Sequence, residues 1–132
     1  MNSRRLLQIM LGVLCAVPLF FGSIGLLQGA ERFMPAEIVT PNADSQIRYM
    51  FGWYLALPAL MIYIIPRIER EGTLLRIIIG CVFFGGLMRL VSIADVGVPD
   101  MQRLIVTALE LGVIALIPWQ ASVARKAKGE KV

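Results

Sequence analysis

Two ionisable residues interrupt apolar runs of this 132-residue sequence, where an unpaired charge is costly in a bilayer. Arg89 lies about five residues, or ~7 Å, from the end of its run, so its long side chain reaches the headgroups. Glu110 lies about 9 to 13 Å inside the next run, and its shorter side chain does not reach them. Glu110 therefore needs a partner or a proton. We predict an ion pair with Arg89, which is either purely structural or also used by a ligand.

Other polar residues share helix faces with this pair. Thr107 precedes Glu110 by three residues, and Ser92 follows Arg89 by three, so each couple lies on one face of a helix. A third stripe begins at Arg48, and we expect the three stripes to converge in the outer leaflet. Trp53 and Tyr54 either line a pocket or belong to an interfacial aromatic belt. The ligand-binding candidates are Arg48, Arg89, Glu110, Trp53, Tyr54, Ser92 and Thr107, and no catalytic residue is identified.

The composition indicates which elements position these residues. Hydrophobic residues make up 58% of the chain, charged residues 17%, and the mean hydropathy is +0.74. Four apolar segments, at about 6–27, 47–66, 74–94 and 102–122, approach the roughly 20 residues that a spanning helix needs. We therefore predict an all-α fold, an integral membrane four-helix bundle that forms a single domain over residues 1–132.

Small residues within these segments predict close helix packing, and a long connection separates the first two. The small residues are Gly22, Gly25, Gly29, Gly52, Ala56, Gly80, Gly85 and Gly86. The connection from Gln28 to Gln46 contains Pro35, Pro41 and Asp44, which favour turns. It is expected to lie as a cap across the bundle or to be a mobile outer loop.

Basic residues predict the orientation of the chain. They precede the first segment, surround the turn between the second and third, and follow the fourth: Arg4, Arg5, Arg67, Arg70, Arg76, Arg125, Lys126, Lys128 and Lys131. These places share one side, so both termini are expected in the cytoplasm. The net charge of +4 is assigned to this topology and to anionic lipid, and nucleic acid is not expected as a partner. The first run is too long for a signal-peptide core and is read as a retained helix.

Several kinds of site are not expected. Histidine is absent, which removes the commonest metal and haem ligand. Cys15 and Cys81 lack CxxC spacing and are assigned to core packing. No phosphate-binding loop or catalytic dyad is recognised. We therefore predict neither a metal site nor a cofactor.

Three sequence patterns carry a family resemblance. Arg48-Tyr49-Met50-Phe51-Gly52-Trp53-Tyr54 opens the second segment, Gly85-Gly86-Leu87-Met88-Arg89-Leu90-Val91-Ser92 lies in the third, and Ala108-Leu109-Glu110-Leu111 lies in the fourth. With them, nearly the whole chain resembles a small bacterial four-helix integral membrane family of unknown function in the DoxX-like superfamily. The resemblance implies kinship with quinone-linked oxidoreductase subunits and structural similarity to sterol-binding membrane proteins.

The function expected from these features is that of an inner-membrane protein. It binds a lipid-like or quinone-like molecule in the outer-leaflet polar cluster, or it serves as a small subunit of a membrane complex. One alternative is a small proton-coupled transporter that uses Glu110. Another is a membrane enzyme with Glu110 as acid or base, which is less favoured because no second acid or base is evident. A scaffold without a ligand is the third. The expected partners are membrane lipid or another lipophilic small molecule, and a membrane protein or a second copy of the chain.

Overall fold

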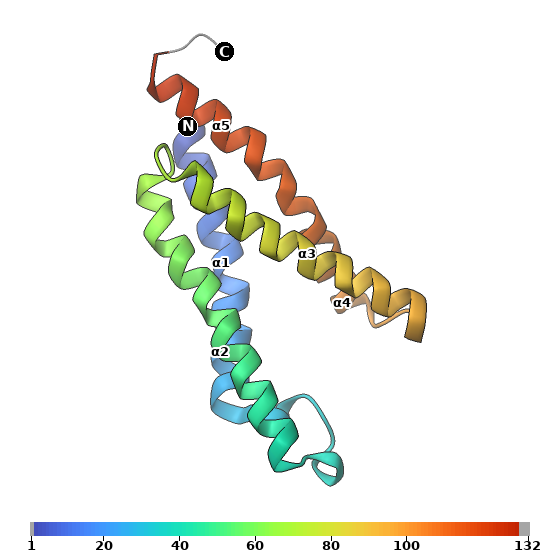
Figure 1. Cartoon of the computed structure of the whole chain (residues 1–132). Coiled ribbons are helices and arrows are strands. Elements are labelled where there is room, and N and C mark those ends of the chain that lie inside the picture. The colour runs from blue at the N-terminus through green and yellow to red at the C-terminus, as the bar shows by residue number, and fades with distance from the viewer. Residues whose placement is uncertain (1, 130–132) are drawn as a thin grey trace. The chain divides into compact units, whose positions relative to one another are not determined.

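The computed structural model describes residues 2–129, and its regular structure there is helical throughout (Figure 1). The helices are α1 (Ser3–Gln28), α2 (Pro41–Ile64), α3 (Gly72–Val96), α4 (Met101–Gly112) and α5 (Leu116–Ala127). Short 3₁₀ turns extend or join them: η1 (Gly29–Arg32), η2 (Ala36–Ile38), η3 (Ile65–Arg67) and η4 (Val113–Ala115). The all-α prediction is confirmed for this part of the chain. Lys131, one of the basic residues used to predict orientation, lies outside it.

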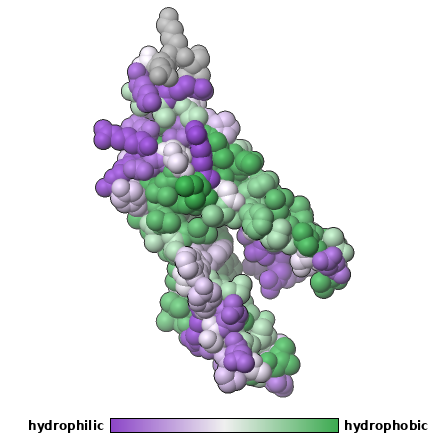
Figure 2. Space-filling model, viewed as in Figure 1, coloured by the Kyte–Doolittle hydropathy of each residue, from purple (hydrophilic) through white to green (hydrophobic). Residues whose placement is uncertain are grey.

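Four helical stretches are long and apolar enough to cross a membrane, as the sequence predicts. They cover Ser3–Arg32, Pro41–Arg67, Gly72–Val96 and Met101–Ala127. Only 11% to 22% of the residues in their most apolar windows are buried, so most residues in these windows are at least partly exposed. Figure 2 shows hydrophobic residues, in green, along the helices and hydrophilic residues, in purple, gathered near the helix ends. Such surfaces are unfavourable in water and favourable in lipid.

The second of these helical stretches begins at Pro41, about six residues before the predicted boundary. The Thr40 side chain accepts a hydrogen bond from the backbone N–H of Ala43 at 3.2 Å, which caps the helix. Pro41 occupies the first helical position, where its missing N–H costs nothing. Assigning Pro41 and Asp44 to the connection was therefore wrong. Both belong to the first turn of α2, because capping residues are polar and a boundary placed by hydropathy excludes them.

The fourth spanning stretch is not one regular helix. It covers the predicted range, but η4 separates α4 from α5. Pro118 follows this turn, and proline lacks the N–H that would bond to the carbonyl of Ile114 four residues earlier. Within η4 the backbone bonds are shorter in sequence: the N–H of Leu116 donates to the carbonyl of Val113, three residues earlier. This pattern tightens the helix locally.

The chain divides into two compact units, each described here by itself. One unit is Gln8–Pro66, and the other joins Met1–Leu7 to Arg67–Val132. We call them the α1–α2 unit and the α3–α5 unit. The arrangement of all four spanning stretches as one bundle and one domain stays a prediction.

Within the α1–α2 unit, glycines let the two helices approach closely. A Cβ added at Gly22 would lie 2.6 Å from Leu55 Cδ2, and one added at Gly25 would overlap the ring of Phe51. Phe33 stacks on the same Phe51 ring, with centroids 4.9 Å apart. The connection after α1 therefore folds back against α2.

The α3–α5 unit is held by close packing and by polar contacts near the ends of its helices. Its α3 contacts both α4 and α5. The buried Gln120 side chain donates from Nε2 to the carbonyl of Ile68 at 2.9 Å. Trp119 donates from Nε1 to Ser3 Oγ at 3.0 Å, and Arg4 pairs with Glu69 at 3.0 Å.

Not every small residue serves packing. A Cβ added at Gly52, Gly80 or Gly85 would meet nothing within 4 Å in the described part of its own unit, so the predicted close approach is not found there. Close approach of these three glycines to the other unit stays a prediction. Cys81 is likewise exposed, whereas Cys15 is buried as predicted. One-dimensional spacing identifies small residues but does not say which face of a helix meets a neighbour.

Candidate functional site

Arg89 of α3 and Glu110 of α4 form the predicted ion pair. Arg89 donates from Nε to Glu110 Oε2 at 2.7 Å and from Nη2 to Oε1 at 3.2 Å. The Glu110 side chain is 15% exposed and that of Arg89 is 39% exposed. Each carboxylate oxygen thus has a charged donor, the two-pronged geometry that guanidinium and carboxylate favour. The pair links α3 to α4. That a ligand also uses it stays a prediction.

Gly86 allows this pair to form. It is buried one turn before Arg89, and a Cβ added to it would lie 3.1 Å from the Cβ of Glu110 and 3.1 Å from Leu111. The absence of a side chain at residue 86 therefore lets α4 approach the face of α3 that carries Arg89. The neighbouring Gly85 meets nothing, so the two adjacent glycines have different roles.

The other candidates on these helices have different surroundings. Thr107 is 4% exposed, and its hydroxyl donates to the carbonyl of Arg103 in its own helix at 2.8 Å. Ser92 is exposed on α3. Thr107 thus continues the polar face of Glu110, but its hydroxyl proton already donates to a backbone carbonyl and is not available to a ligand.

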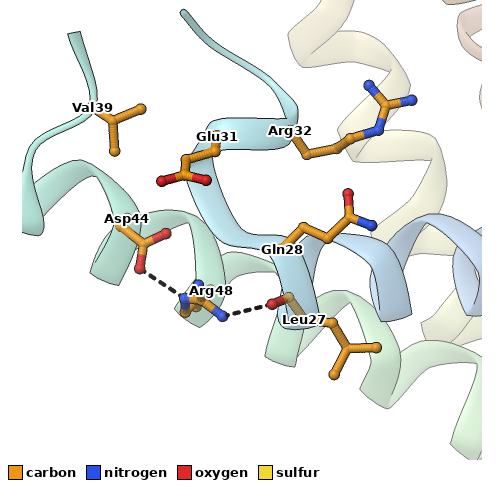
Figure 3. Close-up of a pocket in the computed structure, with 7 residues that line it drawn as sticks. All are labelled: Leu27, Gln28, Glu31, Arg32, Val39, Asp44 and Arg48. Atoms are coloured by element: carbon orange, nitrogen blue, oxygen red, sulfur yellow. Dashed lines mark hydrogen bonds and ion pairs between the residues drawn. The ribbon is translucent and has the colours of Figure 1, made fainter. Parts of the chain in front are cut away.

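Arg48 of α2 belongs to the other unit and ties the end of α1 to α2. It donates from Nε to Asp44 Oδ2 at 2.7 Å, and from Nη1 to the carbonyls of Leu26 and Leu27 at 2.6 and 3.3 Å. The last carbonyls of a helix lack intrahelical donors, so this guanidinium supplies donors that α1 needs. Figure 3 shows Arg48 between Asp44 and Leu27.

Asp44 completes this connection from its other oxygen. The backbone N–H of Ala30 donates to Asp44 Oδ1 at 2.8 Å. The residue before it, Gly29, has φ +64° and lies so close to Asp44 and Arg48 that a Cβ there would overlap the carboxylate. Only glycine fits this turn easily, because the backbone here is left-handed and there is no room for a side chain.

A shallow cavity of about 590 Å³, widely open to the surface, lies beside this network. Charged, amide and apolar groups line it together: Leu27, Gln28, Glu31, Arg32, Val39, Asp44 and Arg48 (Figure 3). Sequence reasoning selected Arg48 but missed Gln28, Glu31 and Arg32, which it treated as part of an outer connection. A usable signal was present, because Asp44 and Arg48 at i and i+4 form a charge pair at the helix start that faces this connection.

Trp53 and Tyr54 differ in their surroundings. Trp53 is 65% exposed and lines a shallow, open surface recess of about 270 Å³ with Tyr49, Gly52 and Ala56. Whether it belongs to a ligand pocket or to an interfacial aromatic belt stays a prediction. Tyr54 instead packs towards α1, where a Cβ at Gly22 would meet its ring at 3.5 Å, and it makes an edge contact with Phe51.

The polar candidates therefore lie in two clusters. Arg48 belongs to the α1–α2 unit, while Arg89 and Glu110 belong to the α3–α5 unit. Their convergence in one site stays a prediction. Among residues 2–129, no three His, Cys, Asp or Glu side chains are grouped so as to hold a metal ion.

Comparison with known proteins identifies the family. Residues 6–120 match the model of the Domain of unknown function (DUF4345). The chain belongs to this family. The DUF4345 match covers all four spanning stretches in large part, including the residues of the Arg89–Glu110 pair and of the Arg48 network. No curated protein and no solved structure matches this DUF4345 chain.

Proposed function

We propose that this chain is a multi-pass protein of the bacterial cytoplasmic membrane that binds a lipid-like or quinone-like molecule, with the polar end of that molecule in the cavity beside Arg48. The observation that carries the proposal is the cavity's mixed lining next to a fixed guanidinium. Ligand sites usually combine apolar walls with a few fixed polar groups, and their volumes are roughly 300 to 1,000 Å³.

The Arg48 guanidinium is suited to orient a ligand because its position is determined by the protein. Nε and Nη1 are both engaged, by Asp44 and by the carbonyls that end α1. The third nitrogen, Nη2, has no hydrogen-bond acceptor within residues 2–129, so it can donate to a ligand. Since the side chain is already ordered, a ligand would lose little affinity to ordering it.

The Arg89–Glu110 pair suits a ligand less well. Both oxygens of Glu110 accept hydrogen bonds from Arg89, so a ligand there would have to replace these bonds. In this proposal the pair holds α3 to α4, and the ligand-binding role moves to Arg48 and its neighbours.

In this proposal the cavity lies in the outer half of the membrane. Basic residues flank the opposite ends of the helices, which favours cytoplasmic termini and an external connection between α1 and α2. The resemblance to the DoxX-like superfamily also favours a lipophilic ligand, since sterol-binding and quinone-linked proteins resemble it.

Co-purification tests the proposal. The protein is purified in a mild detergent, and extracted small molecules are quantified by mass spectrometry. The test variant combines Gln28→Ala with Arg32→Gln, two exposed residues of the cavity. The matched control combines Gln102→Ala with Arg103→Gln, exposed residues at the start of α4.

We expect a near-stoichiometric lipophile in the wild type and in the control, and about tenfold less in the test variant, as the loss of one or two charged or polar contacts predicts. An empty wild-type protein would overturn the proposal. Equal occupancy in both variants would also overturn it, because the lipophile would then lie elsewhere.

A further inference from the structure

Glu31 and Arg32 are neighbours in the chain, and they place one negative and one positive charge on the cavity wall. Both are exposed, and neither forms an ion pair within residues 2–129. The other two charged residues of the cavity, Asp44 and Arg48, neutralise each other at 2.7 Å. The charges left for a ligand are therefore one carboxylate and one guanidinium, besides the Nη2 group of Arg48.

The backbone that carries these two residues is held in place. Both belong to η1, which starts at the left-handed Gly29. Ala30 is fully buried, its N–H donates to Asp44, and its carbonyl accepts from Phe33 and Met34 at 2.9 and 3.0 Å. The turn therefore presents Glu31 and Arg32 from a fixed base, which lowers the entropic cost of binding between them.

The two side chains diverge from this turn. Figure 3 shows Glu31 directed towards the side of Val39 and Asp44, and Arg32 directed the opposite way. A ligand that satisfies both must carry a cation at one end of its headgroup and an anion at the other. Gln28, which offers an amide donor and acceptor, lies on the same wall.

Apolar residues at the cavity indicate where the rest of the ligand lies. Leu27 is 77% exposed at the end of a spanning helix, and Val39 is half-buried on the connection. In a bilayer, acyl chains cover exposed apolar residues of this kind, so an amphiphile bound at the cavity can place its own chain over Leu27 with favourable burial.

We propose that this cavity selects a zwitterionic amphiphile, whose ammonium group pairs with Glu31, whose phosphate pairs with Arg32, and whose chain covers Leu27. This inference rests on the proposed function and names its ligand class. A quinone carries only carbonyl acceptors, which the Glu31 carboxylate repels. An anionic lipid satisfies Arg32 but leaves Glu31 facing another negative group.

Competitive binding to the purified full-length chain tests this selection. Native mass spectrometry in a non-ionic detergent compares dioctanoyl phosphatidylethanolamine, dioctanoyl phosphatidylglycerol and chain-free phosphoethanolamine. The variants are Glu31→Gln and Arg32→Gln. Glu37→Gln is the control, since Glu37 is an exposed acid of the same connection that does not line the cavity.

We expect the wild type to prefer phosphatidylethanolamine over phosphatidylglycerol by about tenfold, the effect of one charged hydrogen bond. Glu31→Gln abolishes this preference, Arg32→Gln weakens both lipids about tenfold, and Glu37→Gln changes neither. Phosphoethanolamine alone binds far more weakly than the lipid.

Three results would overturn the inference in distinguishable ways. In the first, both lipids bind equally, Arg32→Gln weakens their binding and Glu31→Gln does not change it. This result leaves the proposed function intact but rules out selection of a zwitterion. Equal binding of phosphoethanolamine and the lipid removes the chain requirement. Failure of both lipids to bind, and of a short-chain ubiquinone added as a fourth ligand, removes the proposed function itself.

Discussion

Gly86 of α3 lies so close to Glu110 of α4 that a Cβ added to the glycine would be 3.1 Å from the Cβ of the glutamate. Real Cβ atoms rarely approach other atoms this closely. The ion pair between Arg89 and Glu110 therefore depends on a residue one helical turn away that has no polar group of its own. Close packing and charge pairing are coupled at this crossing.

Exchange of Gly86 for leucine tests this coupling. Gly86→Leu is expected to lower the free energy of unfolding by about 1–3 kcal/mol, as overpacking does. Gly85→Leu is the matched control, because a side chain there meets open space. Thermal unfolding in detergent measures both. Equal destabilisation by the two variants would contradict the assigned packing.

Charge reversal at Glu110 tests the pair itself. Glu110→Lys places a second cation against Arg89 and removes both hydrogen bonds, so we expect a loss of about 1–3 kcal/mol in the free energy of unfolding. Combining it with Arg89→Glu restores an ion pair and is expected to recover part of the loss. Unfolding of the single and double variants gives the coupling energy. A fully stable Glu110→Lys protein would show that the pair has no role in the fold.

Asp44→Ala is expected to loosen the connection between α1 and α2. The substitution removes the acceptor for Ala30 N–H and the partner of Arg48, which together anchor η1. Limited proteolysis should cleave the stretch from Phe33 to Thr40 several-fold faster than in the wild type. Asp100→Ala is the control, because the Asp100 carboxylate also accepts from a backbone N–H, that of Arg103 at 2.8 Å, but it caps α4 and does not hold this connection. Unchanged cleavage in Asp44→Ala would contradict the anchoring role.

Reporter fusions test the proposed orientation. A fluorescent protein that folds only in the cytoplasm, fused after Val132, is expected to be active, because basic residues near the ends of the helices favour cytoplasmic retention. A phosphatase active only outside the cytoplasm is expected to work when inserted after Glu37, and to be inactive after Val132. The reverse pattern would place the cavity on the cytoplasmic side.

The sequence by itself determined the number of helical stretches that are long and apolar enough to span a membrane, and one of the two polar clusters. Apolar length is a local property, so four candidate spans are readable without knowledge of the fold. The pairing of Arg89 with Glu110 is readable for a related reason. An unpaired carboxylate deep in an apolar run is costly enough that a partner is required.

Only the tertiary structure decided which small residues bring helices together and where a cavity opens. Gly85 and Gly86 are adjacent in the chain, yet only the second faces another helix. Glu31 and Arg32 are ordinary exposed charges in the sequence, and they become cavity residues because Gly29 reverses the chain and Asp44 holds the turn against α2. These outcomes depend on the direction of each side chain relative to a distant segment, which neither spacing nor hydropathy contains.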